Sequence, residues 1–194
     1  MKIIKEITKT GLSILIILLV LKYTGLIGSL SYATQSAVMK TGLLDSDAEA
    51  NGAESFDYNF AIKDLSGKKI AFDKYKGKVV FLNLWATWCG PCRAEMASIQ
   101  KLYSGMGGDS VSFVMLSLDK DRDKEKVVKY IKDKEFTFPV FLPSGYLSEQ
   151  LNVPSIPTTF VVGKDGKIAM KEIGTTNFNT PKFKKFLQKL STEK

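Results

Sequence analysis

The stretch Trp85-Ala86-Thr87-Trp88-Cys89-Gly90-Pro91-Cys92-Arg93-Ala94-Glu95 decides the fold, and it contains the only two cysteines of the 194-residue chain. It follows the apolar run 79–84, whose length and β-branched residues predict a buried central strand. Pro91 suits the first turn of a helix, where its missing N–H leaves no hydrogen bond unmade. Cys89 is therefore expected at a corner between strand and helix, at the positive end of the helix dipole.

This position favours a reactive cysteine pair over a structural one. A helix N-terminus stabilises a thiolate by about 0.3–1 kcal/mol, and thiol–disulfide exchange requires a reachable thiolate. The alternative is a purely structural disulfide. Closing a loop of about four residues, however, stabilises the fold by only about 2 kcal/mol through the lost entropy of the unfolded chain. Two cysteines in a chain without histidine also cannot complete a zinc site. We therefore expect a redox pair with no metal and no cofactor.

The length and charge of the chain limit the number of domains and the kinds of partner to be expected. The chain is long enough for one well-buried domain plus extra segments, but not comfortably for two domains. Its formal net charge is +8, and of its 28 lysine and arginine residues only Arg93 and Arg122 are arginines. No basic block with interleaved aromatic residues is present, so we expect a solvated lysine surface and no nucleic-acid partner.

Residues 1–33 have the character of a membrane anchor or signal segment. Lysines at positions 2, 5 and 9 precede the apolar run 11–21, and a weaker apolar stretch continues to Leu30 with Lys22 inside it. The strong run has the length of a signal-peptide core, whereas the whole stretch can cross a bilayer. We favour one uncleaved transmembrane helix with a cytoplasmic N-terminus and an extracytoplasmic (periplasmic) domain. The alternative is secretion to the periplasm after cleavage near Ala33.

The rest of the chain divides into a linker and one domain. Residues 34–55 lack aromatic residues and suit a linker, and the folded domain is expected over 56–194. Strand and helix patterns alternate along the domain, so the fold class is α/β with a mixed central sheet flanked by helices. The patterns predict strands over 60–62, 69–72, 79–84, 111–118, 138–142, 158–162 and 167–170, and helices that begin near 90, near 121–123, at 147 and at 181.

Two motifs resemble those of a known superfamily. The stretch 85–92 and the later 156–160 (Ile-Pro-Thr-Thr-Phe) resemble the thioredoxin superfamily, and more narrowly the TlpA/ResA-like membrane-anchored thiol–disulfide oxidoreductases. The resemblance covers roughly residues 56–190. It implies a thioredoxin-like fold with an N-terminal β-hairpin and an inserted α-β unit before Pro157.

The resemblance supplies roles for the cysteine motif. Cys89, the first and outer cysteine, attacks the substrate disulfide, and the more buried Cys92 resolves the mixed disulfide; Gly90 and Pro91 form the active-site loop between them. Glu95 lies three residues after Cys92, on the same helix face. A half-buried carboxylate there holds its proton tightly and serves as general base and acid. The alternative for Glu95 is a solvated surface residue.

The second motif is expected to face the cysteines. Pro157 resembles the cis-proline of the superfamily, which turns the backbone of Ile156 toward the cysteine pair so that a substrate strand can pair with it. Trp88 is expected to offer an apolar landing surface, or else to be a core aromatic. Asn83 stands where thioredoxin has a buried aspartate, and an amide cannot take up a proton.

The direction of electron transfer and the partners of the protein are implied by the resemblance alone. A Gly-Pro pair between the cysteines resembles the reducing members, although potentials in this fold span well over 100 mV. The implied partners are exported proteins that carry disulfides, with apocytochrome c as one candidate, and a membrane electron donor of the CcdA/DsbD type. Two other classes stay open: a peroxiredoxin-like peroxidase, which wants a threonine where Ala86 stands, and a thioredoxin-fold binding module without turnover.

Overall fold

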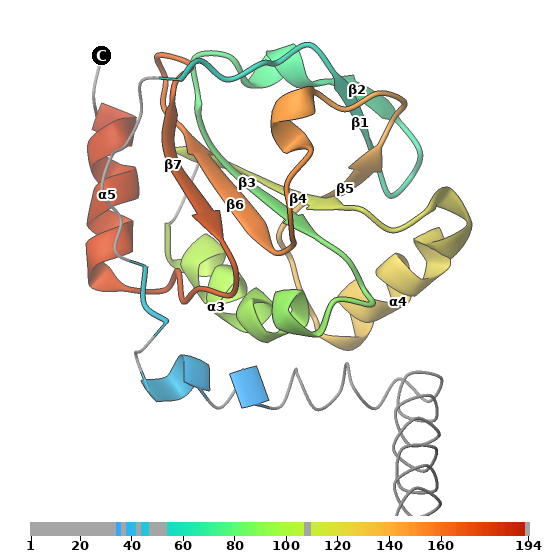
Figure 1. The fold of residues 1–194 in the computed structure, drawn as a ribbon, viewed down its shortest axis with the longest axis horizontal. Helices are drawn as coiled ribbons and strands as arrows, with labels where there is room; N and C mark the ends of the chain where they lie inside the picture. Colours follow the sequence, from blue (N-terminus) through green and yellow to red (C-terminus); the bar gives the residue numbers. More distant parts are fainter. Residues whose placement is uncertain (1–33, 36–37, 42–43, 47–53, 107–109, 193–194) are drawn as a thin grey trace, which may run out of the picture.

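The computed structural model describes residues 34–35, 38–41, 44–46, 54–106 and 110–192 (Figure 1). The predicted membrane segment 1–33 lies outside these residues, as does part of the predicted linker. Among the helices of the described ranges, none combines the length and the apolar character needed to cross a bilayer.

A seven-stranded mixed sheet forms the centre of the domain. Its strands are β1 (Ala61–Asp64), β2 (Lys69–Ala71), β3 (Val79–Trp85), β4 (Val111–Ser117), β5 (Val140–Pro143), β6 (Thr158–Val162) and β7 (Ile168–Ile173). They lie in the order β2-β1-β5-β4-β3-β6-β7. β3–β4 and β4–β5 are parallel pairs, and the other pairs are antiparallel. Every residue of β3 is buried, which confirms the predicted central strand.

Helices cover one face of the sheet and an aromatic layer covers the other. The helices are α3 (Gly90–Met106), α4 (Lys124–Asp133) and α5 (Pro181–Thr192), and they lie along one side of the sheet in Figure 1. Because side chains alternate along a strand, Phe81 of β3 packs with the helices, whereas Leu82 packs with aromatic residues of the segment 56–75. Asn83 therefore points to the same face as Phe81, toward α3.

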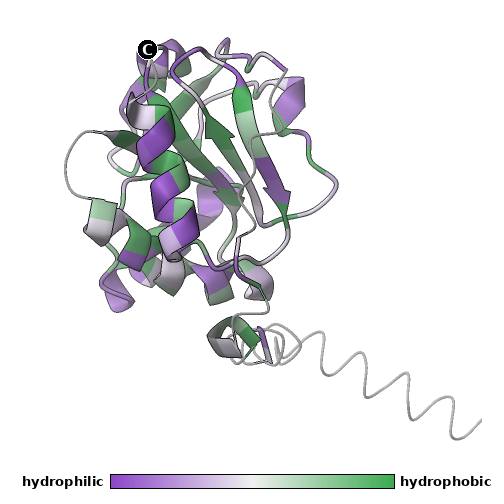
Figure 2. Ribbon diagram, turned by 90° about the vertical axis from the view of Figure 1, so that its left-hand side faces the viewer, coloured by the Kyte–Doolittle hydropathy of each residue, from purple (hydrophilic) through white to green (hydrophobic). Residues whose placement is uncertain are grey.

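The last helix begins as its sequence indicates. Thr180 Oγ1 accepts a hydrogen bond from the Phe183 N–H at 3.1 Å, and Pro181 is the first helical residue. Phe183, Leu187 and Leu190 are buried. Hydrophilic residues occupy the outward side of α5 in Figure 2. Burial of one apolar stripe thus docks α5 on the sheet.

Two of the predicted helices begin differently in the structure. Asp121 and Asp123 belong to a 3₁₀ turn, η3 (Asp121–Asp123), and neither caps α4 with its side chain. The Asp123 carboxylate pairs instead with Lys126 Nζ at 2.7 Å, and Asp121 pairs with Lys63 Nζ at 2.7 Å. The helix expected over 147–151 is shortened to the 3₁₀ turn η4 (Glu149–Leu151).

Candidate active site

The cysteine pair lies at the predicted corner between β3 and α3. β3 ends at Trp85, the Cys89 N–H donates to the Ala86 carbonyl at 3.1 Å, and α3 begins at Gly90. Cys89 and Cys92 are joined by a disulfide. The Cys92 N–H points at Cys89 Sγ across 3.1 Å. A backbone N–H at a helix N-terminus favours negative charge on that sulfur once the disulfide is opened.

The two sulfurs differ in access to solvent. Cys89 is 6% exposed, whereas Cys92 is fully buried. An incoming disulfide therefore meets Cys89 first, and Cys92 reaches only a group already attached to Cys89. This order of access is the one that the attacking and resolving roles require.

The second motif faces the first across the site. The Ile156–Pro157 peptide bond is cis, as predicted. The Ile156 carbonyl oxygen lies 3.7 Å from Cys89 Sγ, and the Pro157 carbonyl accepts the Gly174 N–H at 2.9 Å. The backbone of residues 156–157 is thus fixed beside the more exposed sulfur.

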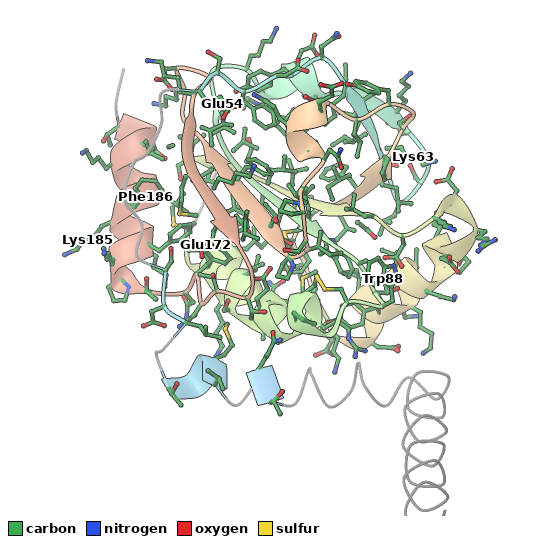
Figure 3. All side chains as sticks on the ribbon, in the orientation of Figure 1. Glu54, Lys63, Trp88, Glu172, Lys185 and Phe186 are labelled. Carbon is green, nitrogen blue, oxygen red and sulfur yellow. A yellow bond between two sulfur atoms is a disulfide. The ribbon has the colours of Figure 1, made fainter. Side chains whose placement is uncertain are left out.

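Two large apolar side chains near the two motifs are exposed. Trp88 is 68% exposed, and Figure 3 labels it near the start of α3. The alternative that Trp88 is a core aromatic is wrong, because the neighbouring Trp85 is the buried one. Ile173, which pairs with Thr158 beside Pro157, is 47% exposed. Ile173 is not among the site residues predicted from the sequence.

Glu95 is completely buried rather than half-buried, so its alternative as a solvated surface residue is wrong. Its Oε1 accepts from Asn83 Nδ2 at 2.8 Å, and its Oε2 accepts from the Thr176 N–H at 3.1 Å. Desolvation raises the pKa of Glu95 to about 8, and the negative charge of Glu172 acts in the same direction, whereas the two hydrogen bonds act against it. Such a group exchanges protons in the neutral range, where disulfide exchange needs an acid and a base.

Asn83 and Thr176 complete the surroundings of Glu95. Asn83 Nδ2 also donates to Thr159 Oγ1 at 2.9 Å. A polar residue inside an apolar strand needs a partner, and this was the sequence signal that could have linked Asn83 to Glu95. Thr176 carries no such signal, because its backbone N–H reaches Glu95 only through the path of the loop after β7.

Asp119 is a site residue that is not among those predicted from the sequence. It is 5% exposed and accepts three hydrogen bonds: from the Thr87 N–H at 2.8 Å, from Thr87 Oγ1 at 2.6 Å and from Ser117 Oγ at 2.6 Å. Trp85 and Ser117 are partners in the parallel β3–β4 register, and Thr87 and Asp119 each lie two residues beyond them. Asp119 thereby fixes the backbone just before Trp88 and Cys89.

The part of the chain that the structure describes offers no metal centre beside this site. Within the described ranges, no cluster of three or more histidine, cysteine, aspartate or glutamate side chains could hold a metal ion. The polar groups of the site instead belong to the Glu95 and Asp119 networks.

Comparison with known proteins agrees with this geometry. The AhpC/TSA family model matches residues 56–171. Thiol-disulfide oxidoreductase ResA of Bacillus cereus is 39% identical over 117 residues, 60% of this chain and 66% of that protein. Sporulation thiol-disulfide oxidoreductase A of Bacillus subtilis is 33% identical over 117 residues, 59% of this chain and 70% of that protein. The chain spans just under two thirds of the length of the ResA relative.

Solved structures give the same fold. The crystal structure of StoA from Bacillus subtilis superposes with a TM-score of 0.54 at 30% sequence identity, and it covers 66% of this chain and 94% of that one. The chain therefore belongs to the AhpC/TSA family and has the thioredoxin-like fold of the thiol–disulfide oxidoreductases that it resembles.

Proposed function

We propose that this protein is a thiol–disulfide oxidoreductase that reduces disulfides in exported proteins. The observation that carries the proposal is the arrangement of the pair: a more exposed Cys89 at a helix N-terminus, a buried Cys92 behind it, and the Ile156 carbonyl 3.7 Å from Cys89 Sγ. The names of the Bacillus relatives support the same activity.

The reaction begins with the reduced pair. The Cys89 thiolate attacks one sulfur of the substrate disulfide, forms a mixed disulfide and releases the first substrate thiolate. The Cys92 thiol loses its proton and attacks Cys89 Sγ, which releases the second substrate thiolate and forms the Cys89–Cys92 disulfide. Two electrons pass to the substrate, and the protein ends in the disulfide state of this structure.

Glu95 is suited to the second step. It lies one helical turn beyond Cys92 on α3, and its pKa of about 8 lets it accept a proton or give one back near neutral pH. A buried thiol resists ionisation, so a nearby base lowers the barrier to attack by Cys92. The protonated form can return a proton to a leaving thiolate.

An extended substrate segment fits the surface beside the pair. The Ile156 backbone offers a carbonyl for strand-like pairing, and the exposed Trp88 and Ile173 offer apolar contact. An unfolded or partly folded protein with a disulfide presents such a segment. Apocytochrome c is one candidate substrate of this kind.

A membrane location and a membrane electron donor complete the proposal. The lysines before the apolar run 11–21 support an N-terminal anchor with the domain outside the cytoplasm, and removal of residues 1–33 as a signal is the alternative. A donor of the CcdA/DsbD type would then re-reduce the pair. Protease protection in intact cells, together with the size of the mature chain, tests the location.

Reduction of insulin by the pre-reduced protein tests the activity. We expect turnover with dithiothreitol as electron donor, no turnover by Cys89→Ser, and accumulation of a mixed disulfide with Cys92→Ser. Equilibration with glutathione should give a potential below about −200 mV, as expected for a reductant. Faster oxidation of thiols than reduction of disulfides would contradict the direction. Consumption of hydrogen peroxide at a rate comparable with that of insulin would favour the peroxidase alternative.

A further inference from the structure

Residues 44–46, inside the predicted linker, are hydrogen-bonded to the loop that follows β7. Asp45 and Asn177 form an isolated parallel bridge. The Asn177 N–H donates to the Leu44 carbonyl at 2.6 Å, and the Ser46 N–H donates to the Asn177 carbonyl at 3.2 Å. Figure 1 shows this short blue segment beside the lower end of α5. Backbone bonds of this kind attach the segment as a strand attaches to a sheet edge.

Side chains strengthen the attachment. Asn177 Nδ2 donates to Asp45 Oδ1 at 2.6 Å, while Asn177 Oδ1 accepts the Asn179 N–H at 3.1 Å. Ser46 is 3% exposed, and its Oγ lies 3.9 Å from Met170 Sδ. Asn177 is thus held between residues 44–46 and its own loop.

The same loop contacts the active site at two points. The N–H of Thr176, the residue before Asn177, donates to Glu95 Oε2 at 3.1 Å. Thr175 Oγ1 lies 3.3 Å from the Pro91 carbonyl between the two cysteines, and it also donates to Gln35 Oε1. The segment before the domain therefore meets the loop at Gln35 and again at residues 44–46, on either side of the donor to Glu95.

We propose that residues 44–46 clamp the loop 174–177, and that Asp45 and Asn177 are positioning residues that keep the Thr176 N–H on the Glu95 carboxylate. The proposal deepens the acid–base role proposed above for Glu95 and rests on it. When the clamp is released, the Thr176 N–H moves off the carboxylate, and the ionised form of Glu95 loses one of its two donors. The acid–base group of the site is then tuned by a segment outside the sheet and its helices.

Three residues determine the surroundings in which Glu95 titrates. Asn83 on β3 donates to it, and among the described residues the charged neighbour that shifts its pKa is Glu172 on β7. Cys92, on the same helix, is in the disulfide and does not titrate in this state. The oxidised protein therefore isolates the titration of Glu95 from that of the cysteines.

Asp45→Ala is the decisive variant because the lost hydrogen bond and the lost charge shift the Glu95 pKa in opposite directions. It removes the acceptor of Asn177 Nδ2, which loosens the clamp and raises the Glu95 pKa. It also removes a negative charge, which by itself would lower that pKa. Asp45 is exposed, so the variant should fold. Asp45→Asn is the matched control, since its side-chain oxygen still accepts from Asn177 while the charge is lost.

A second pair of variants separates the clamp from added charge. Asn177→Asp keeps an acceptor for the Asn179 N–H but sets a carboxylate against Asp45, so it releases the clamp by repulsion. The paired exchange of Asp45→Asn with Asn177→Asp keeps the new charge at position 177 and restores the hydrogen bond with donor and acceptor reversed. Restoration by the exchange assigns the effect to the clamp rather than to the charge.

Titration of the Glu95 carboxyl carbon by ¹³C NMR, on the oxidised full chain in detergent micelles, measures the effect directly. We expect Asp45→Ala and Asn177→Asp to raise the Glu95 pKa by about 0.5 or more, the order of one lost hydrogen bond. Asp45→Asn and the paired exchange should stay within about 0.2 of the wild type.

Three results would overturn the clamp: an unchanged or lowered pKa in Asp45→Ala, a raised pKa that persists in the paired exchange, or a rise in Asp45→Asn equal to that in Asp45→Ala. Insulin reduction by the same wild-type sample tests the proposed function separately. A normal clamp effect without reductase activity would leave the clamp in place and remove the proposed function.

Discussion

Asn83 Nδ2 lies 2.8 Å from Glu95 Oε1 and donates a hydrogen bond to it. The contact joins the central strand to the cysteine helix inside the core, where Glu95 has no access to solvent. An amide at position 83 supplies a donor without a titrating group of its own, so Glu95 is the member of this pair that titrates.

Loss of this donor should make the Glu95 carboxylate harder to form. We expect Asn83→Leu, which keeps the volume and removes the amide, to raise the Glu95 pKa above its value of about 8 by about 0.5–1. The same NMR titration on the oxidised protein checks this. Thr159→Val, which removes the other acceptor of Asn83 Nδ2, is the control and should shift the pKa less. An unchanged pKa in Asn83→Leu would exclude the contact as a tuning interaction.

Burial of Glu95 should make the oxidised protein less stable as the pH rises. The folded-state pKa of about 8 lies above the ordinary 4.5, so the folded state binds more protons than the unfolded state between those values. The free energy of unfolding therefore falls from about pH 4.5 to about pH 8, by an amount of the order of several kcal/mol. Glu95→Gln removes this titration, so its curve should be flatter. Urea unfolding at pH 5 and pH 8 measures the difference, and parallel pH profiles for the two proteins would contradict the prediction.

Replacement of Glu95 should slow the resolving step rather than the first attack. In Glu95→Gln we expect release of the second substrate thiolate to slow about 100-fold near pH 7, because Cys92 has lost its proton acceptor. Attack by Cys89 should keep its rate, since Cys89 is the outer sulfur at the helix N-terminus. Rapid-quench analysis of the mixed disulfide separates the two steps. Equal slowing of both would place Glu95 in a general structural role.

Trp88 should contribute to substrate binding without supporting the fold. Its side chain is 68% exposed, so Trp88→Ala should change the free energy of unfolding by less than about 0.5 kcal/mol. We expect the KM for a protein disulfide to rise several-fold with little change in kcat. Tyr146→Ala is a matched control, because Tyr146 is 67% exposed in the loop between β5 and η4. An equal effect of the two variants on KM would show that Trp88 has no special part.

Asp119 should stabilise the turn before the cysteines. Asp119→Ala leaves the Thr87 N–H and the Thr87 and Ser117 hydroxyl groups without their acceptor. An unpaired buried donor costs about 1–3 kcal/mol. The Ser117 hydroxyl is buried and the two Thr87 donors are partly buried, so we expect a total loss of about 2–3 kcal/mol. Asp121→Ala is the control: its carboxylate is largely exposed in a pair with Lys63, and its loss should cost less than about 1 kcal/mol. Thermal or urea unfolding compares the two, and equal losses would contradict the assignment.

The sequence by itself determined the class of the fold and the centre of its site. The apolar β-branched run directly before the cysteine motif predicts a buried strand that leads into a helix, and β3 and α3 are that strand and helix. The cysteine spacing and Pro91 placed the pair at the corner, because these are local features of the chain. The match of residues 156–160 to a known superfamily identified the cis peptide bond, which spacing alone does not predict.

Only the tertiary structure decided the surroundings of the pair. Complete burial of Glu95 depends on the loop after β7 and on β3 closing over α3, which are far apart in the sequence. Asp119 reaches Thr87 because β3 and β4 pair in parallel and end at the same edge of the sheet. Asp45 meets Asn177 across 132 positions of the chain. The physical reason is the same in each case: hydrogen-bonding groups have no periodic pattern along the chain, so their partners are fixed only when strands, helices and loops pack together.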